Sequence, residues 1–270
     1  GFASLEKSLP NSKKINIKTK DKTFSKTTNN VIIATGARSR NLPFISSDGV
    51  NIWDYKTAMT PSKLPSSLII IGSGAIGMEF ASFYNDLGVK VTVIEALSSI
   101  LPNEDEDISK VVKANFEKRG IEIETNATLK SVKVETNSIS AEILKNRKTK
   151  IINSEKLILA IGIIANTENL GLENYNIKID KGHIVTNEFL ETGEKGIYAI
   201  GDVTEGPWLA HKASHEGILC VEKIAGIKNL TPIDKSSIPG CTYCRPQVAS
   251  IGLTEKKAKD QNLNTKIGKF

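Results

Sequence analysis

The chain has few cysteines and no long apolar run. Only three of its 270 residues are cysteine, an odd number that argues against the disulfide framework of a secreted domain and for reduced thiols. No apolar run approaches the ~20 residues that span a bilayer, and the N-terminus lacks a basic region followed by an apolar stretch. We therefore expect no membrane span and a cytoplasmic location.

A concentrated basic block is also missing, although the formal net charge is +6. Lys and Arg are scattered along the whole length, and clusters such as Lys256-Lys257 stand beside acids. Because affinity for a phosphate backbone needs a concentrated basic face, we expect no nucleic-acid partner. The composition, 39% hydrophobic and 24% charged, is typical of a globular chain long enough for two domains with their own cores.

Apolar runs and turn residues predict a mixed α/β chain. The runs at 15–17 and 31–33 predict a small antiparallel piece. From Leu68, an apolar run, a glycine-rich turn, a helical pattern that ends at Gly88 and a second buried strand at 89–94 predict a βαβ unit. Helices are expected on both faces of its parallel sheet. The remaining predicted elements are a helix at 105–119, strands near 121–123, 131–134, 139–144 and 156–161, a helix from about 209 to 225, and a linker at 231–239.

The strongest local motif is Gly72-Ser73-Gly74-Ala75-Ile76-Gly77, directly after an apolar strand and directly before a helix. In a dinucleotide-binding turn the first glycine permits the tight turn, the second lets the backbone approach a pyrophosphate, and the third lets helix and strand pack closely. The same residues could also form a glycine-rich turn that binds nothing. The strand before it and the helix after it favour a dinucleotide.

Glu95 closes the next strand about 20 residues on, where an acid accepts hydrogen bonds from the adenosine ribose hydroxyls. A carboxylate there would repel the 2′-phosphate of NADP, and Ala96 and Leu97 offer no arginine to hold that phosphate. NAD is therefore the expected cofactor, unless Glu95 is a plain surface acid.

Several further segments resemble the flavin-dependent pyridine nucleotide-disulfide oxidoreductases. Residues 31–37 resemble the strand and Ala-Thr-Gly turn of these two-dinucleotide flavoproteins, residues 197–202 resemble their second flavin motif, and residues 159–162 resemble the closing strand of the nicotinamide domain. Residues 207–217 and 238–244 resemble dihydrolipoyl dehydrogenases, particularly those of Gram-negative bacteria. The resemblance runs over essentially the whole chain.

The resemblance implies an α/β two-dinucleotide-binding-domain flavoprotein fold, with a Rossmann-like NAD domain inserted in a partial FAD domain and the start of an α+β dimerisation domain. The implied divisions are 1–45 for part of the FAD domain, 46–165 for the NAD domain, 166–232 for the return to the FAD and central domain, and 233–270 for the start of the interface domain. Because the sequence begins without Met and stops straight after a charged helical pattern, we expect it to be the middle of a longer polypeptide.

Residue by residue, the resemblance implies contacts to two cofactors, NAD and FAD. Glu79 matches an acid that lies near the flavin in the family, although it could also be a solvated helix acid. Asp202 matches the residue that hydrogen-bonds the ribityl chain of FAD. The implied NAD contacts are Gly72, Ser73, Gly74, Ala75, Ile76, Gly77, Met78, Glu79, Glu95, Leu129 and Gly162, and the implied FAD contacts are Ala3, Thr35, Gly36, Ala37, Asp202, Trp208, Leu209, Ala210 and His211.

The complete enzyme that the resemblance implies passes electrons from a protein-bound dihydrolipoyl dithiol to a cysteine pair, then to FAD, then as hydride to NAD⁺. Its implied partners are a second subunit, whose C-terminal histidine is the base, and the lipoyl domains of 2-oxoacid dehydrogenase complexes or of the glycine cleavage system. We expect no catalytic residue in the present chain, little retained FAD, and an NAD-binding segment from about Leu64 to Gly162. Alternatives are mercuric reductase, glutathione reductase, a soluble transhydrogenase, or an inactive NAD-binding remnant.

The remaining thiols and imidazoles carry no complete motif. Cys241 and Cys244 have C-x-x-C spacing, but no second pair completes a zinc site, and we expect them to be structural and no metal to be bound. His183 and His215 are expected to be surface or helix residues. The segment Ile163-Ile164-Ala165-Asn166 departs from the family's Arg-x-Pro-Asn, and Arg245-Pro246-Gln247 departs from its aromatic- or His-Pro-Glu. Near the end of the chain, Val248, Ile251 and Leu253 are expected to lack packing partners.

Overall fold

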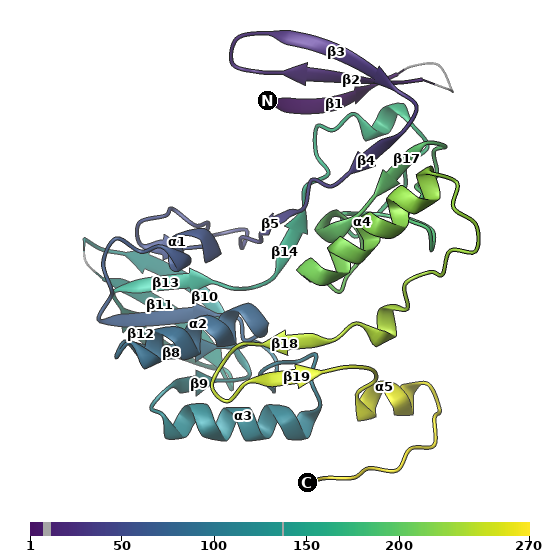
Figure 1. Cartoon of the computed structure of the whole chain (residues 1–270). Coiled ribbons are helices and arrows are strands. Elements are labelled where there is room, and N and C mark those ends of the chain that lie inside the picture. The colour runs from purple at the N-terminus through teal and green to yellow at the C-terminus, as the bar shows by residue number, and fades with distance from the viewer. Residues whose placement is uncertain (8–11, 137) are drawn as a thin grey trace. The chain divides into compact units, whose positions relative to one another are not determined.

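The computed structural model describes residues 1–7, 12–136 and 138–270. The chain forms two compact units (Figure 1). Unit 1 comprises Gly1–Arg38 and Ile163–Ile238, and unit 2 comprises Ser39–Gly162 and Pro239–Phe270. Unit 2 is therefore inserted into unit 1 and also takes up the last segment of the chain. The predicted domain boundaries remain predictions.

Unit 2 is built on a five-stranded parallel sheet in the order β6-β13-β7-β8-β9. Its central strands are near-continuous runs of Leu, Ile and Val, interrupted in β8 by Thr92, as expected for strands that are covered on both faces. The connection from β7 through α2 to β8 is the predicted βαβ unit. The strands are β6 (Ile52–Trp53), β7 (Ser67–Ile71), β8 (Lys90–Ile94), β9 (Glu122–Glu124) and β13 (Lys156–Leu159).

Helices α2 (Ala75–Asp86) and α3 (Glu106–Lys118) cover one face of this sheet. Their inward side chains, among them Tyr84 and Phe116, are fully buried against alternate residues of β7 and β8. Acids in the first turn of α3 and Lys118 in its last turn complement the helix dipole. The hydroxyl of Tyr84 donates to the Ala58 carbonyl at 2.6 Å and so ties down the short helix α1 (Tyr55–Met59).

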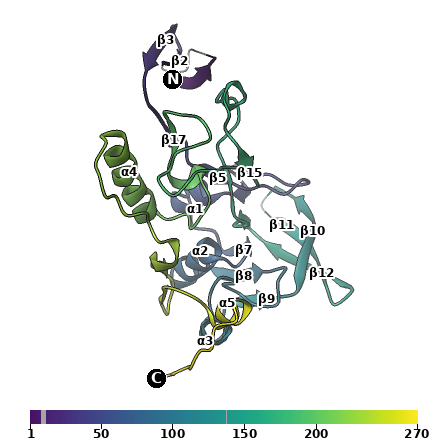
Figure 2. The ribbon, with the colours of Figure 1, turned by 90° about the vertical axis from the view of Figure 1, so that its right-hand side faces the viewer.

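The other face is covered by an antiparallel meander of β10 (Ala127–Val134), β11 (Ile139–Lys145) and β12 (Lys148–Ser154) (Figure 2). Alternate residues of β11, from Ile139 to Ile143, are fully buried against Ile69, Ile71 and their neighbours. The expectation of helices on both faces is therefore wrong. The meander shields the second face because its period-2 alternation also presents a continuous apolar surface.

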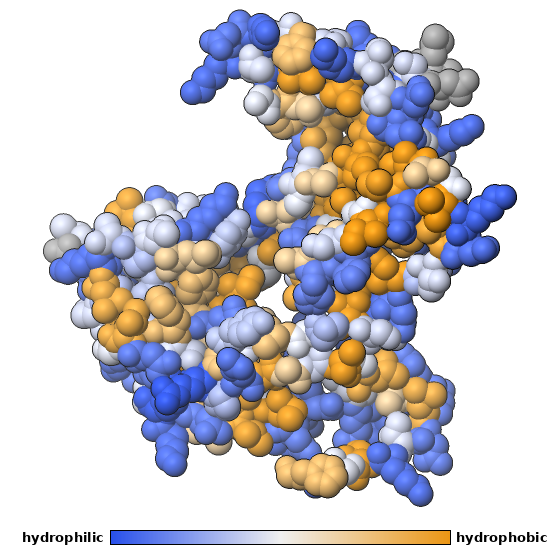
Figure 3. Space-filling model, in the orientation of Figure 1, coloured by the Kyte–Doolittle hydropathy of each residue, from blue (hydrophilic) through white to orange (hydrophobic). Residues whose placement is uncertain are grey.

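The last segment of unit 2 contains β18 (Gly240–Thr242), β19 (Val248–Ser250) and α5 (Glu255–Asp260). Val248 is only 5% exposed and belongs to the core cluster beneath α2 and α3, so the expectation that it lacks partners is wrong. Ile251 and Leu253 are 65% and 42% exposed, as expected. Figure 3 shows apolar groups of this kind on the surface, interspersed with charged ones.

Unit 1 begins with an antiparallel sheet of β1 (Phe2–Glu6), β2 (Lys13–Lys18) and β3 (Thr23–Thr28). The strand β4 (Val31–Ile33) does not join it but pairs in parallel with β17 (Ile197–Ala199). The prediction that residues 31–33 belong to the antiparallel piece is therefore wrong. Its partner strand lies too far along the chain for a local pattern to indicate it.

The long helix of unit 1, α4 (Ala210–Ile224), packs Leu219 and Cys220 against Tyr198 of β17. It matches the predicted helix within two residues. Across the described ranges, no helix is both long and apolar enough to cross a membrane. The short elements are β5 (Ala37–Ser39), β14 (Ile163–Ala165), η1 (Leu172–Asn174), β15 (Ile179–Asp180), β16 (His183–Ile184), η2 (Gly201–Val203) and η3 (Lys235–Ser237).

Candidate dinucleotide-binding sites

The glycine-rich turn of unit 2 lies beyond the carboxyl end of β7, and two of its glycines stand where no side chain fits. Gly72 has a φ of +97°, and a Cβ there would lie 2.4 Å from the Ala160 carbonyl oxygen. A Cβ on Gly77 would lie 2.1 Å from the Gly72 carbonyl oxygen. Strand and helix therefore approach each other at a distance that only glycine allows.

Gly74 differs from these two because it faces open space. A Cβ on Gly74 would meet no atom within 4 Å, and its φ of −69° suits any residue. Helix α2 begins at the next residue, and no side chain caps it. The first N–H groups of a helix need an acceptor and carry a partial positive charge, so a pyrophosphate fits here.

The structure brings Glu95 into direct contact with this turn. Its Oε2 accepts hydrogen bonds from the Ser73 backbone N–H at 2.9 Å and the Ser73 hydroxyl at 2.6 Å, and its Oε1 accepts from the Leu97 N–H at 2.8 Å. Glu95 is 8% exposed and Ser73 is fully buried. Glu95 is thus a buried, oriented carboxylate, and Oε1 keeps one lone pair for a further donor.

The other predicted NAD contacts differ from one another in burial and surroundings. The Met78 side chain is fully buried in the core, and the Leu129 side chain, on strand β10 of the meander, is buried against the sheet, so only their backbones could face a ligand. Gly162 follows β13 with a φ of +101°, and a Cβ there would meet open space. Glu79 Oε1 accepts from the Tyr243 N–H at 2.8 Å. All these assignments remain predictions.

In unit 1 two predicted flavin segments leave the same edge of one ladder. Because β4 and β17 run parallel, Thr35-Gly36 after β4 and Gly201-Asp202 after β17 emerge side by side. The Ile200 N–H donates to the Ile33 carbonyl at 3.0 Å and extends this pairing by one bond. In α/β sheets, ligands bind beyond the carboxyl ends of parallel strands, which is where these two segments lie.

Asn166 lies in the segment that departs from the family's Arg-x-Pro-Asn, and its hydrogen bonds stabilise the Ala-Thr-Gly turn. Its N–H donates to the Gly36 carbonyl at 2.9 Å, and its side-chain amide donates to the Thr35 carbonyl at 3.0 Å. The Thr35 hydroxyl in turn donates to the Asn166 carbonyl at 2.7 Å. Arg38 also binds Asn166 and, bidentately, Glu168, and this lowers the pKa of Glu168.

A histidine without a motif packs on a predicted flavin contact. The ring of His183 stacks on that of Trp208 with centroids 5.1 Å apart, and Trp208 Nε1 donates to the Thr204 carbonyl at 3.1 Å. Nδ1 of His183 is buried and finds no hydrogen-bond partner among the described residues. Of the remaining FAD candidates, Ala3 is exposed on β1, Leu209 is the N-cap of α4, and Ala210 and His211 are its exposed first residues.

The thiols have the environment of structural residues. Burial raises the pKa of Cys220 and of Cys244 to about 11, so both remain thiols at neutral pH and are weak nucleophiles. The Cys244 thiol donates to the Pro246 carbonyl at 3.1 Å. No group of three or more His, Cys, Asp or Glu side chains in the described part of the chain could hold a metal ion.

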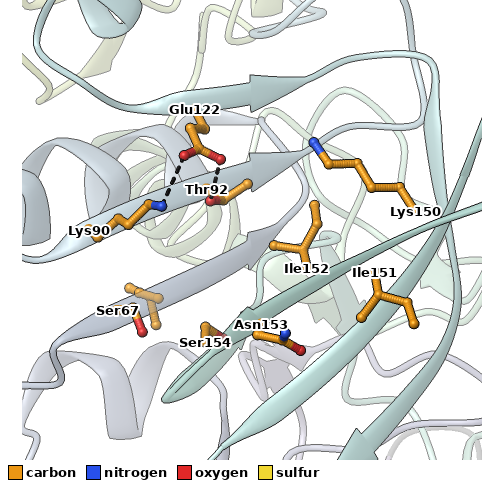
Figure 4. Close-up of a pocket in the computed structure, with 10 residues that line it drawn as sticks. Ser67, Lys90, Thr92, Glu122, Lys150, Ile151, Ile152, Asn153 and Ser154 are labelled. Carbon is orange, nitrogen blue, oxygen red and sulfur yellow. Dashed lines mark hydrogen bonds and ion pairs between the residues drawn. The ribbon is translucent and has the colours of Figure 1, made fainter.

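A hollow in unit 2 lies away from the glycine-rich turn (Figure 4). It has a volume of about 200 Å³ and lies at the amino ends of β7, β8 and β9, below β12. Lys90 and Thr92 both contact Glu122 there, at 3.2 and 3.4 Å. Lys150, which also lines the hollow, is paired with Glu124 at 2.5 Å, and none of the predicted site residues lines it.

Comparison with known protein families supports this picture of two nucleotide sites. The model of the pyridine nucleotide-disulphide oxidoreductases matches residues 4–217, and the model of their dimerisation domain matches residues 238–270. The chain belongs to this family. Membership confirms the predicted fold class, because the matched region contains both the glycine-rich turn and the β4–β17 edge.

Similar curated proteins are dihydrolipoyl dehydrogenases. That of Rhizobium etli is 50% identical over 245 residues, which cover 90% of this chain and 51% of the relative. That of Zymomonas mobilis is 48% identical over 241 residues, which cover 89% and 52%. This member of the oxidoreductase family thus spans about half the length of the curated relatives it matches.

Solved structures of other family members share the fold. LpdA from Mycobacterium tuberculosis matches with a TM-score of 0.89 and 29% identity, over 97% of this chain and 57% of that one. The HOCl-induced flavoprotein disulfide reductase RclA from Escherichia coli matches with a TM-score of 0.80 and 25% identity, over 92% and 56%.

Proposed function

We propose that this chain is the nicotinamide-binding part, together with part of the flavin-binding part, of a dihydrolipoyl dehydrogenase. The observation that carries the proposal is the buried contact between Ser73 and Glu95 beside the open position at Gly74. An NAD pyrophosphate and ribose require groups of this kind. The chain that carries them is 50% identical, over 245 residues, to a dihydrolipoyl dehydrogenase.

The residues of unit 2 would bind and orient NAD. The uncapped start of α2 would receive the pyrophosphate, and Oε1 of Glu95 would accept a hydrogen bond from a ribose hydroxyl. The fit is supported by the space at Gly74 and at Gly162. NAD supplies hydride transfer when it is bound, and the protein contributes orientation and electrostatics.

In unit 1, Asp202 and the Ala-Thr-Gly turn would hold part of FAD. Both lie at the edge where β4 and β17 end, and hydrogen bonds of Asn166 hold the Ala-Thr-Gly turn in place. In the complete enzyme we propose oxidation of protein-bound dihydrolipoamide through a disulfide and FAD, with NAD as acceptor. The proposal includes a cytoplasmic homodimer that serves lipoyl domains of a 2-oxoacid dehydrogenase complex or of the glycine cleavage system.

The test uses the complete polypeptide encoded at this locus. It should reduce NAD⁺ with dihydrolipoamide, followed as NADH formation at 340 nm, faster than it oxidises NADPH with glutathione disulfide or with mercuric ion. A higher rate with one of the other two substrates, or an encoded polypeptide without a C-x-x-x-x-C pair, would overturn the proposal in favour of another flavin disulfide reductase or an inactive remnant.

The 270-residue chain by itself should form no NADH from dihydrolipoamide. Its cysteines are Cys220, Cys241 and Cys244, which do not contain the family's C-x-x-x-x-C spacing, and two of them are buried with the pKa raised to about 11. The measurement is absorbance at 340 nm with a bacterial dihydrolipoyl dehydrogenase as positive control. NADH formation above the rate without protein would contradict this prediction.

The chain should also self-associate as its concentration rises. Ile251 and Leu253 are exposed in the segment that matches the dimerisation domain, and exposed apolar groups favour association. Light scattering should show a rising mean mass, which Ile251→Lys with Leu253→Lys should reduce. Val50→Lys, at a 64% exposed position outside that segment, is the control and should change nothing. A monodisperse monomer at all concentrations would show the prediction wrong.

A further inference from the structure

A buried ion pair on α4 contacts both ends of the turn that presents Asp202. Lys212 Nζ lies 2.8 Å from Glu216 Oε1, and the two side chains are only 1% and 4% exposed. Neither residue is among the predicted FAD contacts. Charged side chains are rarely buried so completely, because desolvation opposes it unless their partners are well placed. The contacts of this pair therefore indicate what it holds.

Those contacts are made to the first and the last residue of the four-residue turn from Gly201 to Thr204. Glu216 Oε2 accepts from the Gly201 N–H at 2.7 Å, and Lys212 Nζ donates to the Thr204 hydroxyl oxygen at 3.3 Å. That hydroxyl donates its own proton to the Gly201 carbonyl at 2.8 Å. The first and last residues of the turn are thus connected to each other and to α4, with Asp202 between them.

The turn has two hydrogen bonds of its own, both accepted by the Gly201 carbonyl, from the Thr204 N–H at 3.0 Å and from the Thr204 hydroxyl at 2.8 Å. It is a single 3₁₀ turn that begins at Gly201 with a φ of +74°, and such turns have poor hydrogen-bond geometry. The i, i+4 spacing puts Lys212 and Glu216 on the same face of α4, so one rigid helix supplies both contacts. The ion pair therefore adds contacts from a rigid helix at both ends of the turn that carries Asp202.

We propose that Lys212 and Glu216 are positioning residues, which fix the Gly201–Thr204 turn so that Asp202 is oriented for the flavin. This rests on the proposed function, because only a flavin-binding protein needs Asp202 in that orientation. Neither residue needs to touch the cofactor.

The first test measures amide hydrogen exchange in the 270-residue chain without cofactor. Lys212→Met should speed exchange at Gly201–Thr204 at least tenfold more than at Ile197–Ala199. The matched control is Lys13→Met, which breaks another ion pair of unit 1. In that pair Lys13 Nζ lies 2.7 Å from Glu194 Oε1, and the lysine side chain is likewise only 1% exposed. Thr204→Val, which removes the hydroxyl without leaving a buried charge, should act in the same direction as Lys212→Met. Equal exchange at the turn in Lys212→Met and Lys13→Met would overturn the proposal.

The second test titrates the same proteins with FAD by fluorescence. Lys212→Met should weaken FAD binding at least tenfold, whereas Lys13→Met should leave it within twofold. In an Asp202→Asn background, Lys212→Met should add less than twofold, because the pair acts through that residue. Equal weakening with and without Asp202 would contradict the positioning role. If the 270-residue chain binds no FAD, the titration is made on the complete polypeptide with the same substitutions; absence of FAD binding there as well would overturn the flavin part of the proposed function, and the exchange measurement still decides whether the pair positions the turn.

Discussion

Gly77→Ala should lower the thermal stability of the nucleotide-binding unit. Gly74→Ala should leave that unit folded but weaken its binding of NADH at least tenfold. The added Cβ at Gly77 would lie 2.1 Å from the Gly72 carbonyl oxygen, so α2 must move away from β7. Overpacking of this kind costs about 1–3 kcal/mol of folding stability. Thermal denaturation measures this loss.

Gly74→Ala is the matched change in the same turn. Its Cβ would meet no protein atom, so stability should change by less than about 1 kcal/mol, the scale of an N-cap substitution. The methyl group would occupy the space that the pyrophosphate requires, and NADH affinity should fall at least tenfold, about 1.4 kcal/mol. Unchanged NADH affinity in folded Gly74→Ala would mean that the open position is not a pyrophosphate site.

NAD(H) should bind at least tenfold more tightly than NADP(H), and Glu95→Gln should narrow that gap. A charge-assisted hydrogen bond from a ribose hydroxyl to the remaining lone pair of Glu95 contributes about 1.5–3 kcal/mol, and NADP instead brings its 2′-phosphate beside this carboxylate. Fluorescence titration of the chain with NADH and NADPH measures both affinities. Equal affinities in the unmutated protein would show that Glu95 does not select the cofactor.

Glutamine is the sharper substitution because of the hydrogen bonds that the structure shows. Glu95→Ala would leave the buried Ser73 N–H without its acceptor, at a cost of about 1–3 kcal/mol, so a loss of binding could simply reflect a disordered turn. Glu95→Gln keeps one side-chain oxygen as an acceptor for the Ser73 N–H and removes the negative charge. Glu95→Arg should favour NADPH only if the contact between Ser73 and residue 95 is dispensable for the fold.

Local patterns predicted the elements whose partners are close in sequence. The strand at Leu68, the turn at Gly72-Gly77, helix α2 and the strand that ends before Glu95 were all predicted because hydrophobic periodicity and turn residues act within a few residues. Two strands of the meander that covers the second face of the sheet, β10 and β11, were predicted but not placed, and its third strand, β12, was not predicted. Periodicity identifies a buried face and does not say which element buries it.

The sequence by itself determined the family, the glycine-rich turn, the acid at the end of the next strand and the long helix that follows the second flavin motif. Only the tertiary structure decided that Val31–Ile33 pairs with Ile197–Ala199, that Asn166 bonds to the Ala-Thr-Gly turn, and that Lys212 and Glu216 contact the two ends of the turn of Asp202. The reason is that buried polar groups must be satisfied wherever the fold brings a partner within about 3 Å, and that partner can lie anywhere along the chain.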